Sequence, residues 1–168
     1  MKTIFLIGFM GSGKSTVGKS LSETYHLSFI DTDAYIEEAY DQKISEIFKV
    51  YGENVFRTYE QEAIERAVTY DVVSTGGGIV ERETNIKTMK NNGKIVFLQT
   101  SFTHIEERLK QDVNRPLWHL NDRTAQISLY ERRNRLYMQY ADVIIHTDDK
   151  SVEEIVQEIG NNFSLSGR

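Results

Sequence analysis

Cysteine is absent from this chain of 168 residues, and proline and tryptophan occur once each. Without cysteine the protein has no disulfide framework and no thiolate metal site. The four histidines, at positions 26, 104, 119 and 146, are scattered along the sequence, which favours surface or structural roles over a metal cluster. A long apolar run and a secretory signal are also lacking. We therefore expect a soluble cytoplasmic protein without a membrane span.

Positive charge is in deficit as well. The chain carries 20 lysines and arginines against 25 aspartates and glutamates, so its net charge is −5. This balance argues against nucleic acid or an anionic membrane as the main partner, although a few arginines in a cleft could still bind a small anion. The length predicts one domain, residues 1–168, with a sizeable core. The sequence is silent on assembly, and we expect a monomer.

The strongest motif is Gly-Phe-Met-Gly-Ser-Gly-Lys-Ser at residues 8–15, which has the spacing of a phosphate-binding loop. Glycines allow the backbone to fold tightly around a polyphosphate, with its N–H groups directed at the oxygens. Lys14 is predicted to reach the β- and γ-phosphates, and Ser15 to ligate Mg²⁺. An apolar run before the loop and a helical pattern after it disfavour a glycine turn without a ligand. The predicted nucleotide-binding residues of the loop are Gly11, Ser12, Gly13, Lys14, Ser15 and Thr16.

Short apolar runs alternate with helical patterns along the whole chain. One helical stripe follows Gly52, and another follows Ser151 and Glu154, which have the spacing of a capping box. Short, mostly apolar runs are typical of parallel strands covered on both faces. Their order predicts an α/β sandwich with a five-stranded parallel sheet and helices on both faces. The predicted strands are residues 3–7, 28–31, 71–74, 94–99 and 141–146.

Asp31 and Asp33 stand at the end of the second predicted strand, where parallel sheets bind their ligands. Two acids at this spacing can face one cleft. One could hold Mg²⁺ through water while the other accepts a hydrogen bond from a substrate hydroxyl. A second interpretation is that Asp33 only caps the helix that follows. The spacing by itself leaves both interpretations open.

Two further features point toward a ligand. Arg57 lies in the first turns of the helix that follows Gly52, where a positive charge opposes the helix dipole. An ion pair with Glu53 or Glu60 would also explain this charge. Three consecutive glycines, residues 76–78, follow the third predicted strand. Their entropic cost makes sense where the backbone approaches a ligand closely, since an ordinary turn seldom needs more than one or two.

A polar connection from about residue 110 to 122 contains the only proline and the only tryptophan. An arginine in a mobile loop, such as Arg115 here, is what the lid of a phosphoryl-transfer enzyme requires. This segment alone, however, favours an arginine that is simply exposed to solvent. Later in the chain Arg132, Arg133 and Arg135 form a basic cluster in a helical pattern. Such a run is usually a solvated helix face.

Taken in order, these motifs resemble the shikimate kinase family along essentially the whole chain. The phosphate-binding loop alone indicates only a nucleotide. Asp31-Thr32-Asp33, the pattern Gly-Glu-x-x-Phe-Arg-x-x-Glu at 52–60 and the triple glycine narrow the resemblance, and Arg-Pro-Leu at 115–117 and Arg-x-x-Leu-Tyr at 133–137 continue it. The resemblance implies a P-loop nucleoside-monophosphate-kinase-like three-layer sandwich. It also implies transfer of the γ-phosphate of ATP to the 3-hydroxyl of shikimate, giving 3-phosphoshikimate and ADP, a step toward chorismate and the aromatic amino acids.

The resemblance also assigns roles to individual residues. Lys14, Asp33 and Arg115 are the implied catalytic residues: Asp33 orients or deprotonates the attacking hydroxyl, and Arg115 comes from the lid onto the phosphates. Mg²⁺ would be ligated by Ser15 directly and assisted by Asp31 through water. Arg108 and Lys150 match positions near the base and ribose of ATP. The implied shikimate site comprises Asp33, Arg57, Gly76, Gly77, Gly78 and Arg133, with the two guanidinium groups pairing with the substrate carboxylate.

Two positions depart from the family pattern. Arg135 stands where proline is common, which makes the register at Arg133 less secure, and Trp118 stands where a smaller apolar residue is common.

Three rival functions can be compared with this one. A gluconate kinase would share the loop and fold without requiring the Phe-Arg motif or the triple glycine. A GTP-dependent switch should carry Asn-Lys-x-Asp, which does not occur here. A catalytically silent regulator would not need Asp33 with three converging arginines.

Overall fold

A parallel five-stranded sheet lies at the centre of the computed structural model, which describes residues 2–113, 115–119 and 122–166. Within these residues the strands pair in the order β2-β3-β1-β4-β5, and every pairing is parallel. All five predicted strands are confirmed: the first has the predicted ends, and each of the others shifts at its first residue by one or two positions. They are β1 (Thr3–Ile7), β2 (Phe29–Asp31), β3 (Val72–Ser74), β4 (Gly93–Gln99) and β5 (Val143–His146).

The sheet buries both of its faces, and alternate residues of β1 divide between them. Phe5 and Ile7 enter one apolar cluster, whereas Ile4 and Leu6 enter the other. This division follows from the two-residue period of a strand. Because both faces are covered, β1 is apolar at four successive positions instead of alternating with polar residues.

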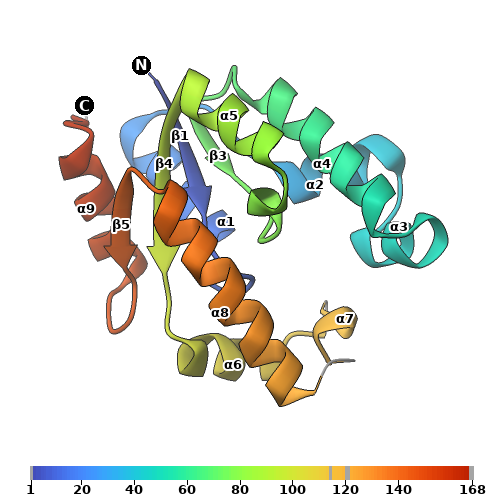
Figure 1. Ribbon diagram of the computed structural model, residues 1–168. Coiled ribbons are helices and arrows are strands. Elements are labelled where there is room, and N and C mark those ends of the chain that lie inside the picture. The colour runs from blue at the N-terminus through green and yellow to red at the C-terminus, as the bar shows by residue number, and fades with distance from the viewer. Residues whose placement is uncertain (1, 114, 120–121, 167–168) are drawn as a thin grey trace.

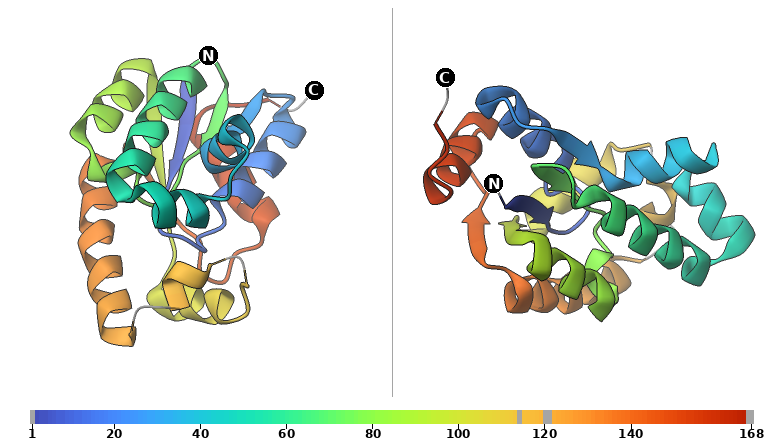
Figure 2. Two further views of the ribbon diagram at one scale, coloured as in Figure 1. Left: turned by 90° about the vertical axis from the view of Figure 1, so that its right-hand side faces the viewer. Right: turned by 90° about the horizontal axis from the view of Figure 1, so that it is seen from above.

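Helices cover the two faces as separate layers (Figure 1, and Figure 2 from above). On one face lie α1 (Lys14–Tyr25) and α9 (Val152–Asn162). On the other lie α4 (Glu53–Ala67), α5 (Glu83–Asn92) and α8 (Arg123–Tyr140). The predicted three-layer sandwich is therefore confirmed.

Local capping signals locate several helix ends. Ser151 and Glu154 form the predicted capping box at the start of α9. The stripe predicted after Gly52 forms the buried face of α4, where Phe56, Ala63 and Ala67 are covered. Two further helices, α2 (Thr32–Tyr40) and α3 (Ile44–Tyr51), pack against α4 and extend the molecule beyond the sheet (Figure 1).

The predicted polar connection from about 110 to 122 contains a short helix. It follows α6 (Phe102–Lys110), includes α7 (Pro116–His119) and leads into α8. Residues 114, 120 and 121 of this segment lie outside the described residues. In Figure 1 the segment lies below the sheet, at the end to which the strand arrows point. It thus faces the edge where the polar motifs gather.

Candidate active site

A cavity of about 380 Å³ opens at the carboxyl ends of the strands. Strand register explains why residues far apart in sequence meet there: Leu6 of β1 pairs with Ser74 of β3, and Ser74 pairs with Asp31 of β2. The segments that follow these strands must therefore share one edge of the sheet. The predicted site residues that line the cavity are Gly11, Ser12, Gly13, Lys14, Ser15, Thr16, Asp31, Asp33, Gly76, Gly77, Arg108, Arg115 and Lys150.

The phosphate-binding loop wraps around the amino group of Lys14. Gly11 and Gly13 have φ values of 79° and 90°, a backbone conformation that favours glycine. Lys14 Nζ donates to the carbonyl oxygens of Gly8 at 2.7 Å and Phe9 at 3.0 Å. Burial lowers the pKa of Lys14 to about 8, against the opposing attraction of Asp33. No side chain caps α1 at Gly13, so the first N–H groups of this helix are suited to an anion.

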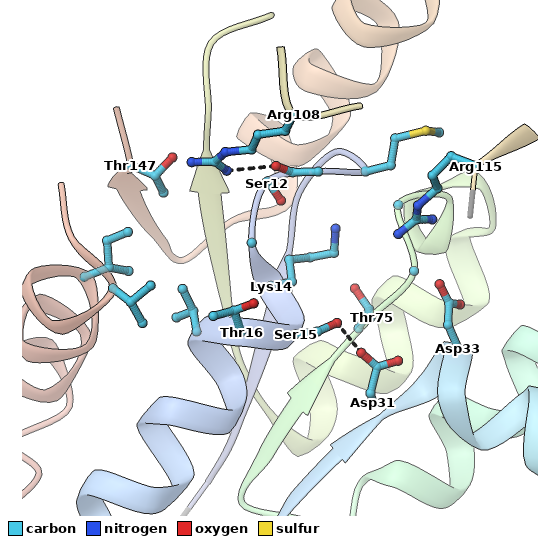
Figure 3. Close-up of a pocket in the computed structure, with 18 of the residues that line it drawn as sticks. Ser12, Lys14, Ser15, Thr16, Asp31, Asp33, Thr75, Arg108, Arg115 and Thr147 are labelled. Carbon is cyan, nitrogen blue, oxygen red and sulfur yellow. Dashed lines mark hydrogen bonds between the residues drawn. The ribbon is translucent and has the colours of Figure 1, made fainter. Parts of the chain in front are cut away.

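Asp31 uses its two oxygens in different ways. Oδ1 accepts from the backbone N–H of Ala34 at 3.0 Å and so caps α2. Oδ2 accepts from the Ser15 hydroxyl (Figure 3). The cap fixes the carboxylate with its second oxygen toward the phosphate-binding loop, so the oxygens of Ser15 and Asp31 face the same cavity.

Asp33 has no capping role, and the interpretation of this residue as a simple helix cap is wrong. Its Oδ1 is buried and has no hydrogen-bond partner among the described residues. Burial raises the pKa of Asp33 to about 7, and the neighbouring carboxylates of Glu60 and Asp31 contribute to the rise. Asp33 and Arg115 lie on the same side of Lys14 in Figure 3. An acid whose pKa lies near neutrality is suited to accept a proton near neutral pH.

The triple glycine makes room for the side chains around it. A Cβ at Gly76 would lie 2.7 Å from Asp33 Oδ1 and 2.8 Å from Glu60 Oε2. A Cβ at Gly78 would overlap the guanidinium of Arg57. None of the three glycines has a positive φ, so close approach of side chains explains them better than turn geometry does.

Arg57 and Arg133 lie against this glycine segment and are not among the residues that line the cavity. Arg57 is buried and donates to Glu60 Oε1 at 2.9 Å and to Glu53 Oε1 at 3.2 Å. Both ion pairs considered from the sequence are therefore present. Arg133 is buried as well; its Nε donates to Glu81 at 2.9 Å, and its Nη1 lies 3.6 Å from the Cβ position of Gly77.

The remaining predicted cations lie around the loop. Arg108 of α6 donates from Nη1 to the carbonyl oxygen of Gly11 at 2.8 Å (Figure 3). Lys150 donates to Glu158 at 2.6 Å. Arg115 lies 3.6 Å from Asp112 in an ion pair and reaches into the lining of the cavity.

Three residues of this region were not assigned by the sequence. Glu60 is fully buried, and its Oε2 has no hydrogen-bond partner among the described residues. Its spacing of three from Arg57 on one helix was the signal that could have identified it. Glu81 and Tyr137 act on the glycine segment and on Arg133, and the Tyr137 hydroxyl donates to the carbonyl oxygen of Gly77. Tyr137 belongs to the Arg-x-x-Leu-Tyr pattern at 133–137, but no local pattern predicts the contacts of either residue, because their partners lie 52 and 60 residues away.

The described residues contain no group of three or more His, Cys, Asp or Glu side chains that could hold a metal ion by itself. Mg²⁺ in phosphoryl-transfer sites is usually bound by one or two protein oxygens together with water and phosphate, so such a group is not required. None of the helices among the described residues is both long and apolar enough to cross a membrane.

Comparisons with known proteins identify a family that this chain resembles along nearly its whole length. The family model for shikimate kinase matches residues 10–163. A shikimate kinase of Bacillus mycoides (strain KBAB4) is 44% identical over 160 residues, which cover 95% of this chain and 96% of the relative. The structure of a shikimate kinase from Acinetobacter baumannii in complex with shikimate has a TM-score of 0.90 and 32% identity, covering 98% of this chain and 94% of that one.

More distant similarity extends to other kinases. The structure of a gluconokinase from Sinorhizobium meliloti superposes with a TM-score of 0.55 at 17% identity, covering 98% of this chain and 93% of that one. At this identity the likeness shows a common fold alone. The family model and the relative at 44% identity span nearly the whole chain. The chain therefore belongs to the shikimate kinase family.

Proposed function

We propose that this protein transfers the γ-phosphoryl group of ATP to the 3-hydroxyl of shikimate. The observation that carries the proposal is the position of Asp33. Its unpartnered oxygen shares a cavity with Lys14 and the phosphate-binding loop, and it lies against Gly76 of the glycine segment, whose Gly78 lies against Arg57. A nucleotide site and a hydroxyl-binding acid thus meet in one cavity, backed by two buried arginines.

Asp33 acts on the attacking hydroxyl. As the bond from the shikimate oxygen to the γ-phosphorus forms and the bond to the β-phosphate oxygen of ATP breaks, the hydroxyl proton passes to the Asp33 carboxylate and ADP leaves. Lys14 and Arg115 place positive charge beside the transferred group, where positioning and charge contribute most to this reaction. Ser15 and Asp31 would hold Mg²⁺, Asp31 through water, because hard carboxylate and hydroxyl oxygens suit this ion. Bound there, it would neutralise phosphate charge.

Arg57, Arg133 and the backbone of Gly76, Gly77 and Gly78 form the shikimate side of the site. Planar guanidinium groups suit the substrate carboxylate, since each can donate two parallel hydrogen bonds. Arg108 and Lys150 are assigned to the base and ribose side of ATP, together with the loop residues.

The setting of the enzyme is also part of the proposal. We place it in the cytoplasm as a monomer with a single catalytic domain and with neither nucleic acid nor a membrane as a partner. Its acidic composition supports the lack of nucleic-acid and membrane partners, since a net charge of −5 disfavours anionic surfaces.

A coupled assay of ADP release tests the function. Shikimate, gluconate and nucleoside monophosphates are supplied in parallel with ATP and Mg²⁺, with a reaction lacking any acceptor as the control. Release that depends on shikimate alone is the expected result. Release with gluconate but not shikimate would replace the proposed acceptor, and release without any acceptor would indicate an ATPase.

A further inference from the structure

One charged pair outside the cavity, Arg132 and Glu81, has no role in the proposed reaction, although Glu81 also binds Arg133. Arg132, beside Arg133 on α8, donates from Nη1 to Glu81 Oε2 at 2.9 Å and from Nη2 to Glu81 Oε1 at 2.8 Å. Oε1 also accepts from Arg133 Nε at 2.9 Å. Glu81 belongs to the short 3₁₀ helix Ile79–Glu81, directly after the glycine segment. One carboxylate is thus shared between two adjacent guanidinium groups.

The two buried arginines behind the glycine segment have opposite charge environments. Arg57 is paired with two carboxylates, those of Glu53 and Glu60. Arg133 shares the single carboxylate of Glu81 with Arg132. The Arg57 cluster therefore has an excess of negative charge when its acids are ionised, whereas the Arg133 cluster keeps an excess of positive charge. Only the second attracts a carboxylate through its net charge.

The geometry of the bond to Glu81 preserves the outer donors of Arg133. Glu81 binds the Nε of Arg133 and leaves Nη1 near Gly77. The Arg133 side chain is 9% exposed, so its charge is only weakly screened by water, whereas Arg132 is 50% exposed and lies toward solvent. Arg132 binds both oxygens of Glu81. It thereby limits how far this carboxylate neutralises the charge of Arg133 and occupies its N–H donors.

We propose that Arg132 is a positioning residue of the substrate site: by engaging both oxygens of Glu81, it keeps the charge and the outer donors of Arg133 available to the substrate carboxylate. This inference rests on the proposed function, because it assumes that Arg133 binds the shikimate carboxylate. Without Arg132, the whole negative charge of Glu81 would act on Arg133, and the Glu81 carboxylate could bind the outer nitrogens of Arg133. The basic cluster on α8 is then part of the site instead of a simple solvated face.

Four variants test the proposal through the KM for shikimate. Arg132→Gln should raise this KM about fivefold, the size expected for loss of one partly screened charge, with kcat and the KM for ATP unchanged. Glu81→Gln should leave it within about twofold of wild type, because the amide oxygen can still accept from Nε. Arg135→Gln removes an exposed arginine of the same helix and is the matched control, expected to change nothing.

The double variant Arg132→Gln/Glu81→Gln is decisive. It removes the competing acid together with Arg132, so the KM for shikimate should return to within about twofold of wild type. If Arg132 only ties α8 to the glycine segment, the double variant will stay as weak as Arg132→Gln, and the proposal is overturned. An unchanged KM in Arg132→Gln overturns it as well. Arg133→Ala separates the two levels: if this variant retains the wild-type KM for shikimate, the carboxylate site of the proposed function is wrong.

Discussion

At the scale of single residues, buried charge is the feature that links this site to its chemistry. Lys14 and Asp33 are held in one cavity, where burial brings their pKa values to about 8 and about 7. The local pattern around Asp33 predicted only a choice between a helix cap and a substrate ligand. Asp31 takes the cap, which leaves the Asp33 carboxylate directed at the cavity.

Asp33→Asn should lower kcat by a factor of about 10² to 10⁴, the usual contribution of a general base, with little change in the KM for ATP. In the wild type, activity should fall as pH drops through about 7, because the Asp33 carboxyl becomes protonated and can no longer accept the hydroxyl proton. The profile of kcat/KM for shikimate against pH measures this limb. The residual activity of Asp33→Asn should lack it, and a limb that persists in the variant would assign the titration to another group.

Substitution of the two buried arginines should have unequal effects. Arg133→Ala should weaken shikimate binding by about 2 kcal/mol or more, as expected for a lost charge-assisted pair. Arg57→Ala should weaken shikimate binding more than ATP binding, but less than Arg133→Ala does, because Glu53 and Glu60 already offset the Arg57 charge. Calorimetric titration with shikimate measures both.

Shikimate methyl ester supplies the control for this comparison. It should bind the wild type more weakly than shikimate, since esterification removes the carboxylate charge. For Arg133→Ala the ester should cost little further affinity. Equal sensitivity of wild type and variant to esterification would contradict the assignment of the carboxylate to Arg133.

At the scale of elements, the segment from α6 to α8 divides into two parts. Trp118 of α7 is 5% exposed and packs edge-on against Phe9 of the phosphate-binding loop, with ring centroids 5.7 Å apart. Phe102 and Tyr130 complete this aromatic group. Val113, by contrast, is 88% exposed. The larger residue at 118, a departure from the family pattern, therefore fixes one part of the connection to the loop.

Closure of the connection over its ligands should consequently involve the part before α7. Adding shikimate with a non-hydrolysable ATP analogue should slow hydrogen exchange at residues 110–113 and 115, because Arg115 is expected to move onto the phosphates. Trp118 is already buried, so its fluorescence emission maximum should change little. Full protection of residues 110–113 without ligand would mean that the connection is fixed.

Arg115→Ala tests the role of the same segment in turnover. The variant should lose most of its kcat, since removal of a donor from developing charge typically costs about 10²- to 10³-fold. Its affinity for shikimate in the absence of nucleotide should stay close to that of the wild type, because the carboxylate arginines are untouched. Equilibrium titration of the apo variant with shikimate measures this, and a comparable loss of binding would place Arg115 in the shikimate site instead.

At the scale of the whole molecule, the site should reduce the stability of the free protein. The folded-state pKa of Asp33 is raised to about 7 from an ordinary value of 3.8. The folded protein therefore holds this proton more tightly than the unfolded chain. The loss in free energy of unfolding that Asp33 causes is absent below about pH 4, grows as pH rises and is complete above pH 7.

Asp33→Asn should remove this penalty. Denaturant unfolding of the apo protein should show a variant more stable than wild type by about 2 kcal/mol at pH 8, a figure reduced for local relaxation, and of similar stability at pH 4. Asp31→Asn is unsuitable as a control because Asp31 caps α2, so the exposed Asp149→Asn serves instead. A variant equally stable to wild type at both pH values would show that Asp33 is not strained by its burial.

The architecture and the phosphate-binding loop follow from local patterns in the sequence. Short apolar runs, the capping box at Ser151 and the glycines at 8, 11 and 13 act through local geometry, so period and spacing were enough to predict the strands, the order of elements and the loop. The family resemblance added the substrate side, and the family is confirmed.

The partners of the charged groups in the site become visible only in the folded protein. Which acid caps α2, why three glycines are needed, and which carboxylates surround Arg57 and Arg133 all depend on contacts between elements. Glu81 meets Arg133 across 52 positions, and Tyr137 meets Gly77 across 60. The electrostatic effect of a charged side chain in this site depends on its burial and on the neighbours that the sheet brings together. Neither can be inferred from the local spacing of residues.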